Sequence, residues 1–271
     1  MTIMASSVMI DVGNGVRLAV SDSGGPHEPA LLLSNSLATS SGMWSEVVDL
    51  LARHVRIVRY DTRGHGASDA PGDGYTLERL GLDALAILDA LDIPRAYICG
   101  VSLGGLTAMW LGIHAADRVC GLVLANTAAS FPPEAMWRER AATARSSGLA
   151  VYVQPSLDRW VTQRYRDDHP ERTAELAAMI TTTSAAGYAG CCEVLATADV
   201  LPDLSRIGCP VHIIAGTQDR STPPERSDQL RVAIPQADLT VLDAAHICAI
   251  EDPQSFADAV STFILTHTGV V

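Results

Sequence analysis

The chain has 271 residues with 48% hydrophobic content, which suits one α/β domain with a large core and an insertion. Its formal net charge is −12 and it contains no basic run, so binding to nucleic acid or to an anionic membrane is disfavoured. All 19 basic residues are arginine, which excludes a Schiff-base lysine, a Ser-Lys dyad and a phosphate-loop lysine.

The six cysteines lie mostly in apolar, strand-like runs, where a free thiol behaves as a small hydrophobic group. Their spacing matches no zinc site, so we expect no metal and no cofactor. The first ten residues lack the positive start and long apolar stretch of a signal peptide, and no run reaches transmembrane length. The sequence therefore predicts a soluble, cytoplasmic protein.

Strands and helices alternate through the first part of the chain. Residues 8–12 and 16–21 predict a β-hairpin around Gly13-Asn14-Gly15. Apolar runs and helical periodicity predict the elements that follow. The expected strands are 30–34, 55–60, 96–99 and 119–125, and the expected helices are 43–53 and 77–91.

The pattern changes after the strand at 119–125. Residues 127–207 show helical periodicity without a clear strand, which indicates a helical cap inserted into the fold. Alternation then resumes with strands 211–215 and 239–242 and helices 224–233 and 252–266. We expect an α/β fold with a mainly parallel, eight-stranded sheet and helices on both faces. Residues 1–126 and 208–271 would form its core.

The most informative stretch is Gly100-Val101-Ser102-Leu103-Gly104. An apolar strand precedes it, and a helix with apolar residues at i, i+3, i+4 and i+7 follows. Strand, Gly-X-Ser-X-Gly and helix together predict a nucleophile elbow, in which a sharp turn exposes the serine hydroxyl. The N–H groups at the start of the helix would point to the place where an oxyanion forms.

A serine nucleophile needs a base within hydrogen-bond distance and a carboxylate that orients this base. After an elbow of this type the chain order is Ser, then Asp or Glu, then His. Asp219 follows the strand at 211–215, and His246 follows the strand at 239–242. Both lie beyond carboxyl ends of parallel strands, where open α/β sheets bind ligands. We therefore expect Ser102, Asp219 and His246 to form a catalytic triad.

Two other residues compete for these roles. Asp243 is close to His246 in sequence, but it ends a strand and more simply tethers the loop. His65 lies between two glycines in a turn before the nucleophile, where it would brace the floor of the site.

The oxyanion hole needs one N–H after the nucleophile and one from the loop after the strand at 30–34. Leu103 and Leu37 occupy those places.

With these residues the chain resembles the α/β-hydrolases over nearly its whole length, and among them the 3-oxoadipate enol-lactonases. The elbow and Arg63-Gly64-His65-Gly66 are shared by many hydrolases, whereas the stretch 187–192 is more specific to the lactonases. The matching segments are Ser34-Asn35-Ser36-Leu37, residues 60–66, 100–105 and 187–192, Thr222-Pro223-Pro224 and Asp243-Ala244-Ala245-His246. Ala249 departs from the family, in which asparagine is common at this place.

The resemblance implies hydrolysis of the enol-lactone of 3-oxoadipate to the open diacid without a cofactor. The same residues would also serve a general carboxylesterase, an acyl-homoserine lactonase or a perhydrolase. A hydrolase fold kept as a small-ligand receptor with little turnover is a third possibility. The expected partner is a small lactone or ester, with no nucleic acid and no membrane, and the sequence does not predict an oligomeric state.

The implied substrate carries a free carboxylate, which requires a cation or N–H groups in the pocket. We expect Trp137 and Trp160 as apolar walls and Arg138 as the partner of the carboxylate, with Arg140 and Arg164 as alternatives. Arg138 and Arg140 are about 200° apart on a helix, so only one of them can face the pocket.

Overall fold

The computed structural model describes residues 6–24, 29–52 and 55–268, which form an eight-stranded sheet in the order β1-β2-β4-β3-β5-β6-β7-β8. β1 (Ser6–Asp11), β2 (Arg17–Asp22) and β4 (Arg56–Tyr60) pair antiparallel in that order. Every later pair of neighbours is parallel. The expected α/β fold with a mainly parallel sheet is thus confirmed.

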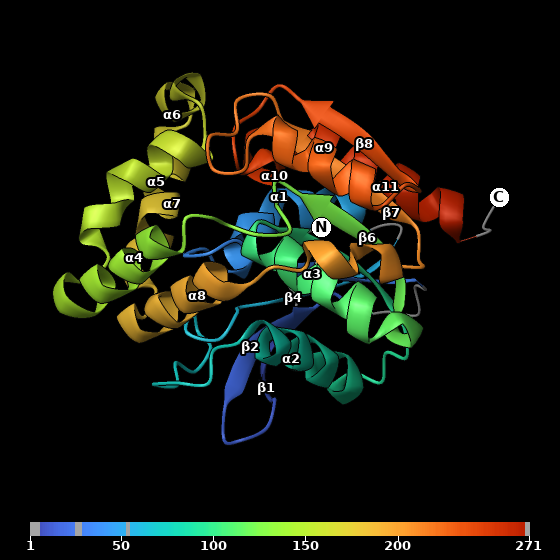
Figure 1. The fold of residues 1–271 in the computed structure, drawn as a ribbon, viewed down its shortest axis with the longest axis horizontal. Helices are drawn as coiled ribbons and strands as arrows, with labels where there is room; N and C mark the ends of the chain where they lie inside the picture. The colour runs from blue at the N-terminus through green and yellow to red at the C-terminus, as the bar shows by residue number, and fades with distance from the viewer. Residues whose placement is uncertain (1–5, 25–28, 53–54, 269–271) are drawn as a thin grey trace.

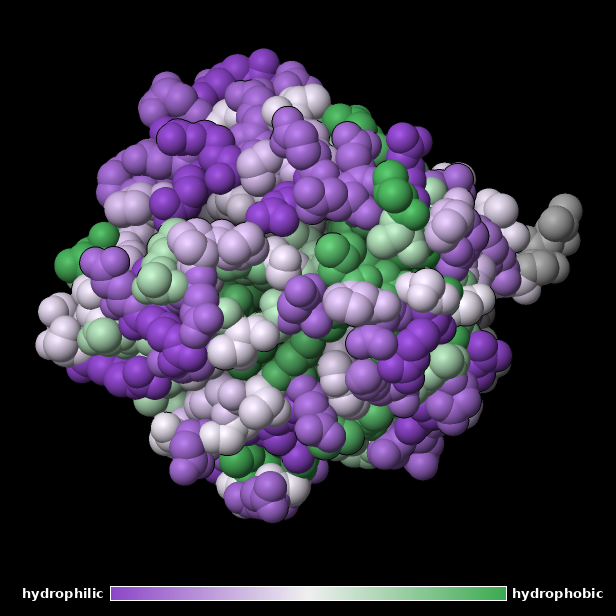
Figure 2. Space-filling view, viewed as in Figure 1, coloured by the Kyte–Doolittle hydropathy of each residue, from purple (hydrophilic) through white to green (hydrophobic). Residues whose placement is uncertain are grey.

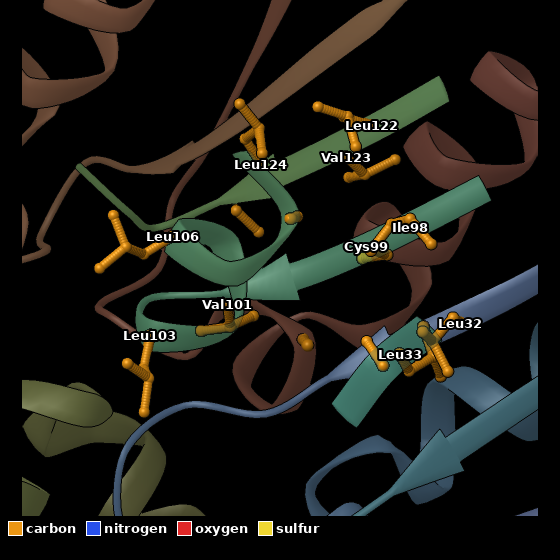
Figure 3. Close-up of a cluster of buried hydrophobic side chains, with 14 of the residues drawn as sticks. Leu32, Leu33, Ile98, Cys99, Val101, Leu103, Leu106, Leu122, Val123 and Leu124 are labelled. Carbon is orange, nitrogen blue, oxygen red and sulfur yellow. The ribbon is translucent and has the colours of Figure 1, made fainter. Parts of the chain in front are cut away.

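The central strands β3 (Ala30–Ser34), β5 (Ala96–Val101) and β6 (Val119–Ala125) are almost entirely buried. Helices cover both faces of the sheet (Figure 1), which explains why these strands are apolar along their whole length. Side chains of Leu32, Ile98 and Leu122 lie on neighbouring strands in this core (Figure 3). The sheet continues to β7 (Val211–Gly216) and ends at β8 (Ala237–Leu242).

The helices between the strands pack in two layers. One layer contains α2, α3 and α9, and the other contains α1 and α11 (Figure 1). The bounds are α1 (Ser45–Leu51), α2 (Leu77–Ala90), α3 (Leu103–His114), α9 (Pro224–Ala233), α10 (Cys248–Glu251) and α11 (Pro253–His267). Two short 3-10 helices, η1 (Ser41–Trp44) and η2 (Ala116–Arg118), precede α1 and β6.

Between β6 and β7 the chain forms five α-helices that stand at one side of the sheet (Figure 1), and we call α4–α8 the helical insertion. One isolated sheet-type bridge, between Ser130 and Asp199, joins the segments that lead into and out of the insertion. Its elements are α4 (Glu134–Ser147), η3 (Ala150–Tyr152), α5 (Val153–Trp160), α6 (Gln163–Asp168), α7 (Pro170–Thr182) and α8 (Ala185–Thr197), and η4 (Leu201–Arg206) follows.

Element bounds differ from the expected ones at a few ends. The helix expected at 43–53 begins earlier, as η1, because the Ser40 hydroxyl accepts a hydrogen bond from the Gly42 N–H. Its α-helical part ends at Leu51, and residue 53 lies outside the described residues. β5 continues to Val101, and β8 starts at Ala237 rather than at Leu239, because both strands keep pairing with their parallel neighbours.

The surface seen in Figure 2 is mostly hydrophilic, with apolar residues gathered near its middle, beside α9. Leu201 and Val232 are exposed in a groove between η4 and α9. No helix in the described part of the chain is both long and apolar enough to span a bilayer. No disulfide joins any of the six cysteines, all of which lie in the described residues.

One close contact joins the helical insertion to the sheet. Gly187 of α8 lies against Gly64, in the turn after β4, and a Cβ at Gly187 would overlap the Gly64 backbone. The Ser184 N–H also donates to the Gly64 carbonyl over 3.1 Å. Backbone rather than side chain fills this space, so the contact has little room to adjust.

We expect Gly187→Ala to lower the free energy of unfolding by about 1–3 kcal/mol, since the added methyl group must displace backbone. Urea unfolding measures the change. Gly208→Ala is the matched control, because a Cβ there meets nothing within 4 Å. Equal loss of stability in both variants would contradict this account of the contact.

Candidate active site

Ser102 lies in a strained turn between β5 and α3. Its φ of 57° falls in the left-handed region, which costs a residue other than glycine about 1–3 kcal/mol. The Ser102 N–H donates to the Ala125 carbonyl (3.1 Å), and the Thr127 hydroxyl donates to the Ser102 carbonyl (2.7 Å). The turn from Val101 into Leu103 is visible in Figure 3. This geometry is typical of a nucleophile elbow.

The two outer glycines of the motif allow backbone segments to pass at van der Waals distance. A Cβ at Gly100 would overlap the backbone of Gly104, and a Cβ at Gly104 would overlap the Ser34 carbonyl at the end of β3. The elbow therefore fits between its own strand and the neighbouring strand only with glycine at both places.

His246 and Asp219 form a buried pair beside the elbow. The His246 Nδ1 lies 2.9 Å from Asp219 Oδ2, and the side chains are 3% and 0% exposed. Asp219 follows β7, and His246 follows β8. Ser102 and His246 line the same cavity, of about 50 Å³. The structure thus brings together all three residues expected for the triad.

Four further hydrogen bonds hold the Asp219 carboxylate. Ser221 and Thr222 donate their N–H groups to Oδ1 (2.7 and 2.9 Å), and the Thr222 hydroxyl donates to Oδ2 (2.7 Å). The Asn126 amide donates to Oδ2 over 3.1 Å. Burial raises the pKa of Asp219, but His246 and Thr222 lower it more strongly, so the net pKa is below its ordinary value. The group is a carboxylate at neutral pH.

Sequence reasoning missed Asn126 and the role of Thr222. Asn126 directly follows β6 with a φ of 44°, and its amide also donates to the Ala245 carbonyl over 3.3 Å. It therefore connects the ends of β6, β7 and the loop that carries His246. A polar residue directly after an apolar parallel strand is the signal that could have found it.

The rival residues lie elsewhere. Asp243 is exposed and accepts hydrogen bonds from Thr217 (3.1 Å) and Gln218 (3.0 Å). His65 is buried, with Nδ1 3.1 Å from the Arg63 carbonyl oxygen, and it does not line the cavity. These placements favour Asp219 as the acid and His246 as the base.

The two backbone donors expected for an oxyanion hole lie near Ser102. Leu37 lines the cavity on the loop after β3, next to Ala38 with its left-handed φ of 62°. Leu103 is the first residue of α3. Neither N–H has an acceptor among the described residues, so both can donate to a developing oxyanion.

The helical insertion supplies the opposite wall of the cavity. Trp137 and Trp160 line it as expected, and so do Arg140 and Arg159. Arg138 does not, and this corrects our expectation: it is exposed and pairs with Glu134 (2.6 Å) and Glu193 (3.4 Å). Periodicity left open which of the two arginines on α4 turns inward, and packing selects Arg140.

Arg164, the other alternative for the carboxylate partner, is exposed and lies outside the cavity lining.

In the described part of the chain, no group of three or more His, Cys, Asp or Glu side chains could hold a metal ion. Ala249 is buried in α10, away from the cavity lining.

Hydrogen bonds tie the loop of His246 to the helical insertion. The His246 and Ile247 N–H groups donate to the Arg159 (3.4 Å) and Trp160 (2.8 Å) carbonyls. The Glu251 carboxylate accepts from the Ala245 N–H (2.9 Å) and from the N–H (3.2 Å) and hydroxyl of Thr162. The position of His246 therefore depends on the end of α5.

The family model described as the alpha/beta hydrolase fold matches residues 29–253. The chain belongs to this family. Its relatives include 3-oxoadipate enol-lactonase 2 of Acinetobacter baylyi, 42% identical over 90% of this chain and 92% of that protein. The organism's 3-oxoadipate enol-lactonase 1 is 40% identical over 95% and 97% of the two chains.

The crystal structure of the enol-lactonase from Burkholderia xenovorans LB400 is similar throughout. It has a TM-score of 0.91 and 38% identity, over 94% of this chain and 99% of that one. The resemblance to the enol-lactonases is thereby confirmed for this α/β-hydrolase.

We expect Asp219→Asn to lower kcat for ester hydrolysis by roughly 10⁴-fold, because an amide holds the imidazole in the wrong tautomer. Hydrolysis of p-nitrophenyl acetate measures the effect. Asp243→Asn is the control and should change kcat less than about twofold, as Asp243 is exposed. The reverse ranking would assign the acid to Asp243.

Glu251→Ala should lower kcat by roughly 10-fold, since it frees the loop that positions His246 and small displacements of catalytic groups are costly. Glu193→Ala, which removes partly exposed pairs with Arg138 and Arg145, should leave kcat unchanged. An unchanged kcat in Glu251→Ala would show that the insertion does not position His246.

Proposed function

We propose that this chain is a carboxylic ester hydrolase that opens 3-oxoadipate enol-lactone with water to give 3-oxoadipate, in the β-ketoadipate pathway of aromatic catabolism. The observation that carries the proposal is the buried His246–Asp219 pair, which shares a cavity with the strained Ser102. The enol-lactonase relatives support the substrate. The reaction needs water as its only co-substrate. We propose that it takes place in the cytoplasm.

The mechanism follows from the positions of the side chains. Ser102 Oγ attacks the lactone carbonyl while His246 accepts its proton, and Asp219 stabilises the imidazolium. The Leu37 and Leu103 N–H groups bind the oxyanion. When the ring C–O bond breaks, the leaving oxygen is an enolate, which accepts the proton from His246 and tautomerises to the ketone. Water then attacks the acyl-enzyme with His246 as base, releasing 3-oxoadipate and Ser102.

An enol-lactone suits this site because its leaving group is stabilised. The negative charge spreads from oxygen to carbon, so acylation needs little help from a strong general acid. A serine, a histidine base and two backbone donors are sufficient for such an activated ester.

We assign residues 127–207 as a cap and residues 1–126 and 208–271 as the catalytic core. Trp137 and Trp160 would form apolar walls beside the lactone ring and exclude water. The cavity, of about 50 Å³, is lined by residues of both the cap and the core, so a bound substrate would contact both parts.

The decisive experiment follows the ultraviolet absorbance of 3-oxoadipate enol-lactone during incubation with the protein, beside a panel of simple esters and an acyl-homoserine lactone. We expect the enol-lactone to be the preferred substrate. If the protein prefers the acyl-homoserine lactone or a simple ester, that compound becomes the substrate in place of the enol-lactone. If it hydrolyses no ester at all, the fold serves as a small-ligand receptor rather than as an enzyme.

Ser102→Ala should abolish turnover and keep the fold, because alanine removes only the hydroxyl. Circular dichroism and residual activity check both parts. Ser146→Ala, an exposed position on α4, is the control and should be fully active. Residual activity above a few per cent in a pure preparation would exclude Ser102 as the nucleophile.

A further inference from the structure

Two arginines of the helical insertion face the same cavity as Ser102 and His246. They are Arg140 of α4 and Arg159 of α5. Arg145 on α4 and Arg166, which follows α5, pair with Glu193 (3.5 Å) and Asp158 (3.2 Å). Neither Arg140 nor Arg159 has a carboxylate within ion-pair distance among the described residues. The cavity is therefore lined by two arginines and by no carboxylate.

Aromatic rings hold Arg140 in place. Its guanidinium carbon lies 5.0 Å from the ring centre of Trp137, 4.9 Å from that of Tyr152 and 5.8 Å from that of Tyr188. The Arg140 Nε also donates to the Tyr188 hydroxyl over 2.9 Å. Cation–π contacts stabilise the charge without neutralising it. The terminal nitrogens form no hydrogen bond with other described residues, so they remain able to bind a ligand.

Arg159 completes the pair from the neighbouring helix. Burial lowers the pKa of Arg159, and the positive charges of Arg140 and Arg220 lower it further. A guanidinium nevertheless stays protonated at neutral pH. The side chain forms no hydrogen bond with other described residues, whereas its backbone carbonyl accepts from the His246 N–H (3.4 Å). An anion between the two arginines would remove their repulsion.

We propose that Arg140 and Arg159 bind the free carboxylate of the substrate, the group that takes no part in ring opening. A carboxylate accepts two parallel hydrogen bonds from a guanidinium, so two arginines can hold both of its oxygens. The lactone carbonyl then lies toward Ser102, on the opposite side of the cavity. The identity of the lactone rests on the proposed function, but the anion site depends only on the two arginines.

The first test compares two substrates in Arg140→Gln and Arg159→Gln. The KM for 3-oxoadipate enol-lactone should rise roughly 10- to 150-fold, the usual worth of a charged hydrogen bond. The kcat/KM for uncharged p-nitrophenyl acetate should change less than about threefold. Arg145→Gln, exposed on the same helix, is the control and should behave as the parent protein.

Arg159→Lys provides a second variant if glutamine impairs folding, since it keeps the charge and loses the paired geometry. We expect a smaller rise in KM than with glutamine. An unchanged ratio of lactone to acetate activity in the variants at 140 and 159 would overturn the proposal, and so would an equal loss on both substrates.

The second test needs no lactone. Adipate, a six-carbon dicarboxylate, should inhibit p-nitrophenyl acetate hydrolysis competitively in the parent protein and at least 10-fold more weakly in either glutamine variant. Sodium chloride at equal ionic strength controls for screening. If the enol-lactone is not hydrolysed but adipate competes, the proposed function fails and the anion site stands. If adipate does not compete in the parent protein, the anion site is wrong.

Discussion

The site depends on one buried carboxylate and the donors that surround it. Asp219 is removed from water, which is costly for a charge unless hydrogen bonds and a partner replace the solvent. Its partners come from three places in the chain: Asn126 after β6, Ser221 and Thr222 beside it after β7, and His246 after β8. Because these strands are parallel neighbours, their carboxyl ends lie close together. The hydrogen bonds to the Asp219 carboxylate therefore hold the three loops in place relative to one another.

A second constraint is the close approach of backbone at the elbow. The turn through Ser102 fits against β3 because Gly100 and Gly104 lack side chains, and the strained φ of Ser102 is held by hydrogen bonds to Ala125 and Thr127. The loop of His246 is held differently, because the His246 and Ile247 N–H groups donate to the Arg159 and Trp160 carbonyls in α5 of the helical insertion. The proposed nucleophile and the proposed base are thus positioned by different parts of the molecule, the sheet and the insertion.

The sequence predicted the sheet and the elbow, and it singled out Ser102, Asp219 and His246, which lie together in the structure. These features depend on local periodicity and on the order of motifs along the chain. It did not predict the residues that act across loops. Asn126 reaches Asp219 from the end of β6, and Glu251 joins the loop of His246 to Thr162, so both contacts depend on segments that are distant in the chain. Thr222 lies in the same loop as Asp219, and its contact depends on the conformation of that loop. Helical geometry predicted that Arg138 and Arg140 point apart, but the inward one depends on Tyr152 and Tyr188, which periodicity does not place.

The aromatic neighbours of Arg140 hold its guanidinium group without cancelling its positive charge. A carboxylate partner would neutralise the guanidinium and compete with an anionic substrate, whereas aromatic rings hold it and leave its charge available. Burial raises the pKa of Tyr188, so the phenol stays neutral and does not become an internal anion. The chain carries −12 overall and repels small anions at long range. The pair of arginines that lines the cavity offsets that field at the place where we propose that the substrate carboxylate binds.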